Sequence, residues 1–131
     1  MNVKDQHVTV VGLARSGVAA ARLLDQLGAK VTVADRKEPQ ELDAVLSQLD
    51  QGKIAVNVGA QYESALDLAD LVVISPGVPT QLEALKRVRA RGGRVIGELE
   101  LASRFVTAPI VAVTGTNGKS TTVTLIGKFL Q

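Results

Sequence analysis

The chain has 131 residues, of which 46% are hydrophobic and 21% are charged, and this composition excludes a disordered protein or a coiled coil. Its formal charge of +2 comes from scattered basic residues, apart from a cluster at Lys86–Arg94 that reads as a solvated helix face, so nucleic-acid binding is not indicated. No cysteine is present for a disulfide or a thiolate metal site, and no apolar stretch is long enough to span a membrane, so we expect a cytoplasmic protein.

Short aliphatic runs alternate with longer helical patterns along the chain, a rhythm typical of βαβ units that build a parallel sheet. Strands are expected at His7–Val11, Lys30–Ala34, Ile54–Val58, Leu71–Ser75, Arg94–Ile96 and Ile110–Thr114. Helical patterns are expected at Val18–Leu27, Leu42–Leu49, Leu82–Val88 and Glu98–Phe105, with a short helical turn within Ala60–Asp70. The first five strands complete an α/β domain whose parallel sheet is flanked by helices.

Glycine and proline positions mark where these elements end. Gly28, Gly52 and Gly92 follow the three amphipathic patterns, and glycine is the preferred residue just after a helix C-terminus. Pro109 ends the helical pattern before the last predicted strand. We therefore divide the chain into a complete domain over residues 1–98 and the beginning of a second domain over residues 99–131.

The first predicted strand runs into Gly12-Leu13-Ala14-Arg15-Ser16-Gly17 and then a helix, where a dinucleotide-binding fold holds a pyrophosphate on the helix N-terminus. The fingerprint is incomplete because its middle glycine is replaced by Ala14, and that glycine normally lets the pyrophosphate approach the backbone. Tight NAD binding is therefore disfavoured. The turn fits either an anion site or a plain strand-to-helix turn with Ser16 near the helix start.

Two further features lie where predicted strands end. Asp35 stands about twenty residues past the first turn, where dinucleotide-binding proteins place a carboxylate on the ribose, and Arg36 and Lys37 follow it. This carboxylate is equally suited to bind the edge of a base or to cap the loop. The stiff segment Ser75–Pro79 lies at the carboxyl edge of the predicted sheet, where ligands of such folds bind, although a simple turn is the alternative.

The last predicted strand leads into Gly115-Thr116-Asn117-Gly118-Lys119-Ser120-Thr121 and a helix, which is the context that a phosphate-binding loop requires. In such a loop backbone N–H groups surround phosphate oxygens, Lys119 supplies a point charge and the Ser120 hydroxyl can ligate Mg²⁺. The general motif places its first glycine where this chain has Val113, so the loop is a shorter form. We interpret it as an ATP-binding loop rather than an incidental glycine-rich turn.

The segment Thr114–Thr121 resembles the nucleotide loop of the Mur ligase family, which joins amino acids to the peptidoglycan precursor. The resemblance covers the whole chain, because other segments stand in the order and spacing of the family's D-glutamate-adding branch: Gly12–Gly17, Asp35–Lys37, Ser75–Gly77 and Ala108–Val111. It implies a Rossmann-like first domain over residues 1–98 that binds a UDP-sugar, in keeping with Ala14. Residues 99–131 would open a central ATP-binding domain.

The resemblance also implies the residues that bind each substrate. Those for the UDP-substrate are Arg15, Ser16, Asp35, Arg36, Ser75, Pro76 and Gly77. Among them, Asp35 and Arg36 would meet the uracil and residues 75–77 the diphosphate. Those for ATP are Gly115, Thr116, Asn117, Gly118, Lys119, Ser120 and Thr121, with Ser120 also ligating Mg²⁺.

The implied reaction joins D-glutamate to UDP-N-acetylmuramoyl-L-alanine through an acyl phosphate, with release of ADP and phosphate. We expect no ligase activity from this chain alone, because the family's other Mg²⁺ ligands and its C-terminal domain would lie beyond Gln131. We also expect the apolar segment 110–131 either to fold back on the first domain or to self-associate with another copy.

Two other functions remain open from the residues themselves. A stand-alone dinucleotide-binding module is favoured by Asp35 and the first glycine turn, and disfavoured by Ala14. A non-catalytic nucleotide-sensing domain would use the second glycine loop alone. Binding of a UDP-sugar, NAD or ATP distinguishes these from the ligase.

Overall fold

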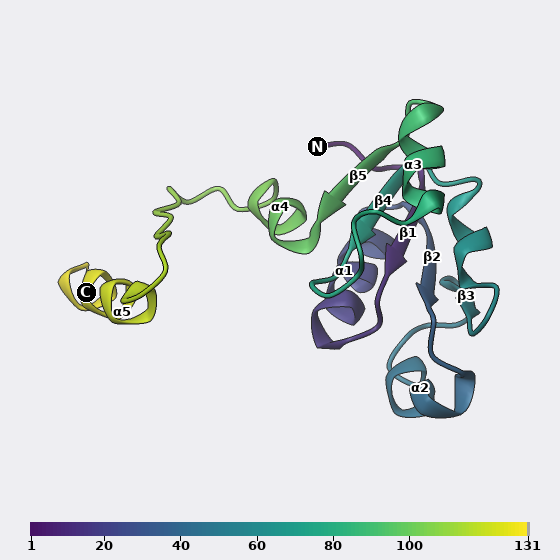
Figure 1. Ribbon diagram of the computed structural model, residues 1–131, viewed down its shortest axis with the longest axis horizontal. Coiled ribbons are helices and arrows are strands. Elements are labelled where there is room, and N and C mark those ends of the chain that lie inside the picture. Colours follow the sequence, from purple (N-terminus) through teal and green to yellow (C-terminus); the bar gives the residue numbers. More distant parts are fainter. Residues whose placement is uncertain (131) are drawn as a thin grey trace.

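The computed structural model of the protein describes residues 1–130 and contains a parallel sheet of five strands in the order β3-β2-β1-β4-β5 (Figure 1). The strands are β1 (His7–Val11), β2 (Lys30–Asp35), β3 (Ala55–Val58), β4 (Leu71–Ile74) and β5 (Arg94–Gly97). The helices are α1 (Arg15–Gln26), α2 (Pro39–Leu46), α3 (Glu83–Ala90), α4 (Glu98–Ser103) and α5 (Lys119–Phe129), with a 3-10 helix η1 (Tyr62–Leu66) before β4. The predicted α/β domain with a five-stranded parallel sheet is confirmed.

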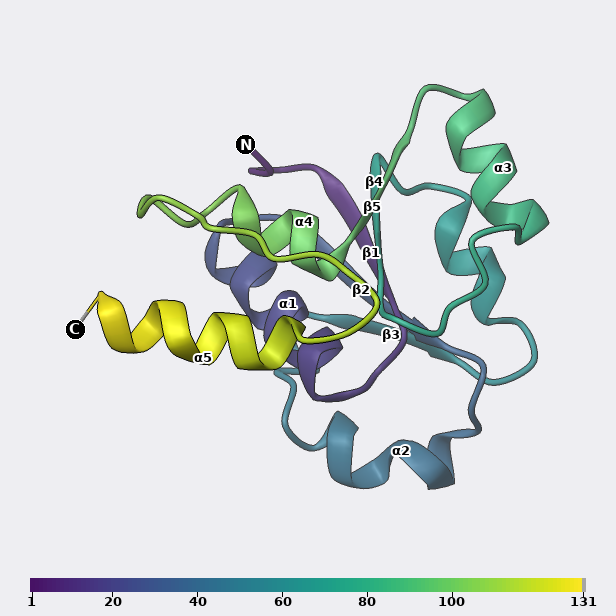
Figure 2. The ribbon, with the colours of Figure 1, turned by 60° about the vertical axis from the view of Figure 1, so that its left-hand side comes forward.

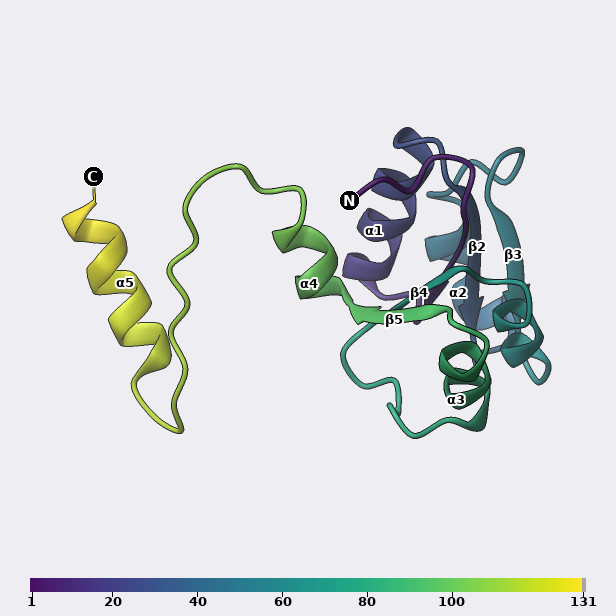
Figure 3. The ribbon, with the colours of Figure 1, turned by 90° about the horizontal axis from the view of Figure 1, so that it is seen from above.

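Helices cover both faces of the sheet, and Figure 3 shows α1 and α3 on opposite sides of the strands. The helices α1, α2 and α4 share one core cluster with the sheet, around buried residues such as Val10, Leu24 and Leu71. On the other face, α3 and η1 pack around Val72 and Leu85. Because both faces are covered, β1 and β4 consist largely of consecutive aliphatic residues, as in other parallel sheets.

The helix α2 begins and ends earlier than the predicted helix Leu42–Leu49. Pro39 occupies its first turn, where the missing N–H of proline costs nothing, and Glu38 and Glu41 form a reciprocal capping box. Leu49 is still buried in the core, but from the turn that follows the helix. The apolar spacing therefore identified the buried face, while the capping residues decide where the helix starts.

The predicted strand Ile110–Thr114 is not formed, since within residues 1–130 none of its residues pairs with a strand. A strand depends on hydrogen bonds to a neighbouring strand, and this segment runs away from the edge strand β5 toward α5 (Figure 1 and Figure 3). Figure 2 shows the same connection between α4 and α5 from another side. The physical reason for the difference is the lack of a pairing edge beside this segment, because its residues are themselves strongly β-forming.

The expected folding of this segment onto the first domain is wrong for the part of the chain that the structure describes. Helix α5 lies apart from the sheet in Figure 1 and Figure 3, and Val123, Leu125 and Phe129 are 54%, 50% and 86% exposed. Self-association stays a prediction, as does the domain division at residue 98. Within residues 1–130, none of the helices combines the length and the apolarity that a bilayer crossing needs.

Candidate functional site

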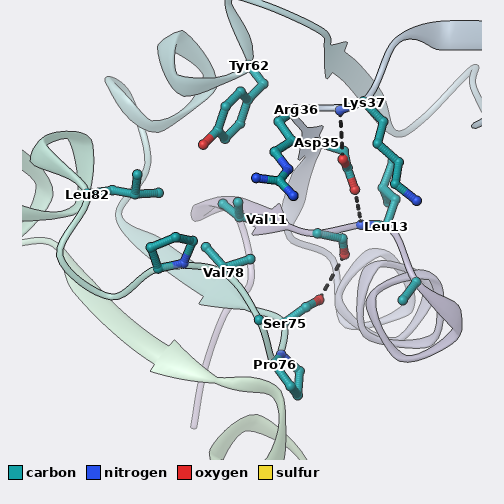
Figure 4. A pocket seen from close by; sticks show the side chains of 14 residues that line it. Val11, Leu13, Asp35, Arg36, Lys37, Tyr62, Ser75, Pro76, Val78 and Leu82 are labelled. Carbon is teal, nitrogen blue, oxygen red and sulfur yellow. Dashed lines mark hydrogen bonds between the residues drawn. The ribbon is translucent and has the colours of Figure 1, made fainter. Parts of the chain in front are cut away.

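A cavity of about 340 Å³ opens at the carboxyl edge of the sheet, between the loops that follow β1 and β4 (Figure 4). The strand β1 lies between β2 and β4, so the chain crosses to opposite sides of β1 in its two halves. Ligands of open parallel sheets bind at this kind of switch point. The cavity is lined by Val11, Gly12, Leu13, Ala14, Asp35, Arg36, Lys37, Tyr62, Ser75, Pro76, Gly77, Val78, Pro79 and Leu82.

The first glycine turn is packed so closely that two of its positions accept no side chain. A Cβ on Gly12 would lie 2.7 Å from the Cβ of Ser75, and a Cβ on Gly17 would lie 2.0 Å from the Gly12 carbonyl oxygen. Both glycines thus serve the contact between the turn, helix α1 and the β4 loop. Ala14, the N-cap of α1, lines the cavity instead, so its methyl group limits how near a ligand can approach the backbone.

The structure does not bring Arg15 and Ser16 into this cavity, as far as the described residues show. Both are exposed in the first turn of α1. Ser16 instead lines a separate apolar groove between α1 and α4, together with Leu23 and Leu101. The predicted contact of these two residues with a UDP-substrate stays a prediction.

Asp35, at the end of β2, ties two loops together. Its carboxylate accepts the backbone N–H of Leu13 at 2.7 Å and that of Lys37 at 2.9 Å. Asp35 therefore caps the loop, as one of the sequence-based interpretations of this residue predicts. Each carboxylate oxygen has a second lone pair, and Asp35 lines the cavity, so the same group can also accept a hydrogen bond from a ligand.

Ser75, directly after β4, is buried, with 6% of its surface exposed. Its hydroxyl lies 2.9 Å from the Gly12 carbonyl oxygen and is also hydrogen-bonded to a carboxylate oxygen of Glu98. Pro76 and Gly77 follow it on the exposed rim of the cavity. The predicted loop is thus held against the first glycine turn through Ser75.

One wall of the cavity combines the end of the predicted loop Ser75–Pro79 with Tyr62 and Leu82, which the sequence did not indicate as site residues. It is formed by Tyr62 of η1 and by Val78, Pro79 and Leu82, which lead into α3 (Figure 4). Burial raises the pKa of the Tyr62 phenol above its ordinary value, and among nearby charges Glu63 adds to this effect. The hydroxyl is therefore protonated at neutral pH. This wall offers an aromatic ring and aliphatic carbon opposite the polar loops.

The second glycine loop is exposed throughout, and it lies with α5 apart from the sheet and from the loops at the sheet's edge (Figure 1). Gly118 takes a left-handed φ of 77° as the N-cap of α5, and the first intrahelical bond runs from Thr122 N–H to its carbonyl at 2.9 Å. The N–H groups of residues 119–121 therefore point along the helix axis toward the loop. The Lys119 ammonium donates to the Gly115 carbonyl at 2.5 Å, within the same loop.

These donors fit a phosphate group. The loop supplies N–H groups, an ammonium and the hydroxyls of Ser120 and Thr121, which are the groups that phosphate oxygens accept from. The loop offers fewer groups that could bind a metal ion. Among residues 1–130, no three His, Cys, Asp or Glu side chains gather as a metal site would require.

Comparison with known proteins gives consistent matches. Residues 6–97 match the family described as Mur ligase MurD-like, N-terminal domain. UDP-N-acetylmuramoylalanine–D-glutamate ligases of Citrifermentans bemidjiense and Trichlorobacter lovleyi are each 47% identical over 131 residues, which is 100% of this chain. The solved structure of a pseudomurein peptide ligase type C from Methanothermus fervidus covers 96% of the chain with 28% identity and a TM-score of 0.58.

The chain is much shorter than these relatives. It spans 29% of the length of the two D-glutamate ligases and 26% of the pseudomurein peptide ligase. The family match ends at residue 97, whereas the two ligase alignments continue through the second glycine loop. Both glycine loops therefore have counterparts in the same longer proteins.

Proposed function

Since the chain belongs to the Mur ligase family, with a MurD-like N-terminal domain, we propose that it serves the ATP-dependent addition of D-glutamate to UDP-N-acetylmuramoyl-L-alanine in peptidoglycan precursor synthesis. Its part in that reaction is to hold the UDP-substrate. The observation that carries the proposal is the cavity at the switch point between β1 and β4, which combines a polar loop edge with an apolar wall. A cytoplasmic location belongs to the same proposal.

The nucleotide end of the substrate would enter between the apolar wall and Asp35. Tyr62, Pro79 and Leu82 offer flat or aliphatic surface for a base, while the remaining lone pairs of Asp35 accept from a base N–H. The rim residues Ser75, Pro76 and Gly77 would meet the diphosphate, and Arg36 and Lys37 add positive charge to the cavity lining. The residues that line the cavity thus suit a ligand with both a base and an anionic group, rather than an anion alone.

ATP would bind at the second glycine loop. Gly115, Gly118 and Lys119 would surround its phosphates with backbone N–H groups and one ammonium, and Ser120 would bind Mg²⁺. When bound, the metal supplies electrostatic stabilisation of the transferred phosphoryl group. The Lys119 ammonium has three N–H donors, so two remain for phosphate oxygens beside its bond to the Gly115 carbonyl.

By itself, the chain is proposed to bind substrate without catalysing amide formation. The loop is exposed and lies apart from the cavity, whereas catalysis requires both substrates to be held together with the metal. The relatives are more than three times longer, since this chain spans 29% of their length.

Calorimetric titration of the chain with UDP-N-acetylmuramoyl-L-alanine, NAD and ATP with Mg²⁺ tests the proposal. We expect saturable binding of the UDP-substrate, weakened about threefold by Arg36→Gln because one cavity charge is lost. Arg89→Gln on α3 is the matched control, since Arg89 is exposed and lies outside the cavity lining of the described residues. Saturable NAD binding without any response to the UDP-substrate would favour the dinucleotide-binding module and overturn the proposal.

A further inference from the structure

Three neighbouring strands end at the same level on the carboxyl edge of the sheet. The register pairs Val11 of β1 with Ile74 of β4, and Ile74 with Gly97 of β5. The next residue along each strand therefore stands in one row: Gly12, Ser75 and Glu98. Parallel pairing keeps such a row together wherever the strands stop in register.

The row is joined through the Ser75 hydroxyl. This group contacts the Gly12 carbonyl oxygen at 2.9 Å and a carboxylate oxygen of Glu98. A hydroxyl has a single proton to donate, so it serves one of these two acceptors at a time. A phosphate oxygen arriving at Ser75 would be a third acceptor for the same proton, and its negative charge would also repel the Glu98 carboxylate.

Glu98 connects this hydroxyl to a part of the molecule outside the cavity. It is the first residue of α4, which packs on the sheet domain through the buried Leu101 and leads to the second glycine loop. Within residues 1–130, no residue of α4 lines the cavity. A change at Ser75 can therefore reach α4 through the Glu98 side chain, without any direct contact between a ligand and that helix.

We propose that Glu98 is a positioning residue that couples occupation of the anion subsite at Ser75 to the placement of α4, and so of the segment that carries the second glycine loop. The coupling rests on the proposed function, because it takes a diphosphate as the ligand at Ser75. With the cavity empty, Glu98 holds the start of α4 against the β4 loop. With a diphosphate bound, the hydroxyl turns to the phosphate and the carboxylate releases α4.

Amide resonances of residues 99–104, measured by NMR as uridine or UDP is added to the chain, test this coupling. UDP is expected to move these resonances in the unsubstituted chain, and uridine, which lacks phosphate, is expected to leave them in place. In Glu98→Ala the resonances should already be displaced without ligand and should no longer respond to UDP. Glu98→Gln keeps an oxygen acceptor and loses the charge, so we expect it to restore the ligand-free resonances and to bind UDP about fivefold tighter at low salt.

Glu100→Gln is the matched control, because it removes the same charge from the same helix. Its carboxylate pairs with Arg104 on the exposed side of α4. We expect it to leave both the UDP affinity and the response of α4 to UDP unchanged. An equal effect of the Glu98 and Glu100 substitutions overturns the coupling. If UDP binds and the α4 resonances do not respond, the coupling is overturned and the proposed function stands. If UDP does not bind, the proposed function and the coupling are overturned together.

Discussion

The two glycine loops of this protein follow the same plan and differ in their support. The turn Gly12–Gly17 is held between β1, β4 and α1, and its neighbours Asp35 and Ser75 bond to it from two sides. The loop Gly115–Thr121 runs into the first turn of α5, but among the described residues it has no strand before it and no buried neighbour. A glycine motif thus supplies the local backbone shape, while the surrounding sheet supplies rigidity.

The difference also bears on ligand binding. Around the first turn, side chains from β2, η1 and the β4 loop already converge on a cavity, so a ligand meets an ordered surface. At the second loop, Lys119 bonds to Gly115 within the loop itself. Preorganisation reduces the entropy that binding must overcome, so the first site is the one expected to bind tightly in this chain.

Gly17→Ala should give the largest effect on stability. Its new Cβ would lie 2.0 Å from the Gly12 carbonyl oxygen, so the turn must open, and we expect a loss of about 4 kcal/mol in the free energy of unfolding. Gly127→Ala in α5 is the control, since apart from its chain neighbours and the adjoining backbone of α5, no atom of the described residues lies within 4 Å of the added Cβ. Urea denaturation should show an unchanged midpoint for Gly127→Ala. Equal losses in both variants would contradict the contrast between the two regions.

The second-largest difference in stability between the sheet domain and α5 should come from removing apolar side chains. Leu24 of α1 is fully buried, so Leu24→Ala should cost about 3 kcal/mol through lost contacts and a residual cavity. Leu125 of α5 is 50% exposed, and Leu125→Ala should change the unfolding free energy by less than about 0.5 kcal/mol. Thermal unfolding followed by circular dichroism compares the two. A large loss for Leu125→Ala would mean that α5 packs against the sheet domain in solution.

Ligand affinity gives a smaller and more local contrast. Tyr62→Ala removes the ring from the apolar wall, and we expect UDP to bind about tenfold more weakly, while Tyr62→Phe keeps the ring and should stay within about twofold. Lys119→Ala changes the second loop only, so it should leave UDP affinity unchanged. Calorimetry measures all three. A tenfold loss in Tyr62→Phe would instead assign the binding to the hydroxyl.

The sequence predicted the sheet and one side of the cavity well. The strands were found because aliphatic runs buried on both faces are unmistakable, and Gly12, Asp35 and Ser75 were found because each follows or ends such a run. Tyr62 was missed because its segment is a 3-10 turn without a clear apolar period. Glu98 was missed because its contact with Ser75 depends on the register of β5 against β4, which single-strand patterns do not contain.

The predicted strand Ile110–Thr114 shows a different limit. Its residues favour extended backbone, but a strand also needs an edge to pair with, and that edge is a property of the whole sheet. Arg15 and Ser16 show a third limit. Their assignment came from a resemblance in motif order, and the first turn of α1 leaves both outside the cavity lining of the described residues.

The smallest effect should come from contacts between copies of the chain. Leu130, just after α5, and Leu68, just after η1, are similarly exposed at 77% and 79%, but only Leu130 adjoins the apolar residues of α5. If α5 self-associates, Leu130→Ser should weaken the association constant about threefold, and Leu68→Ser should not change it. Sedimentation equilibrium measures both. Equal weakening by both variants would show that general surface apolarity drives association, and a monomer at millimolar concentration would show that α5 tolerates exposure without a partner.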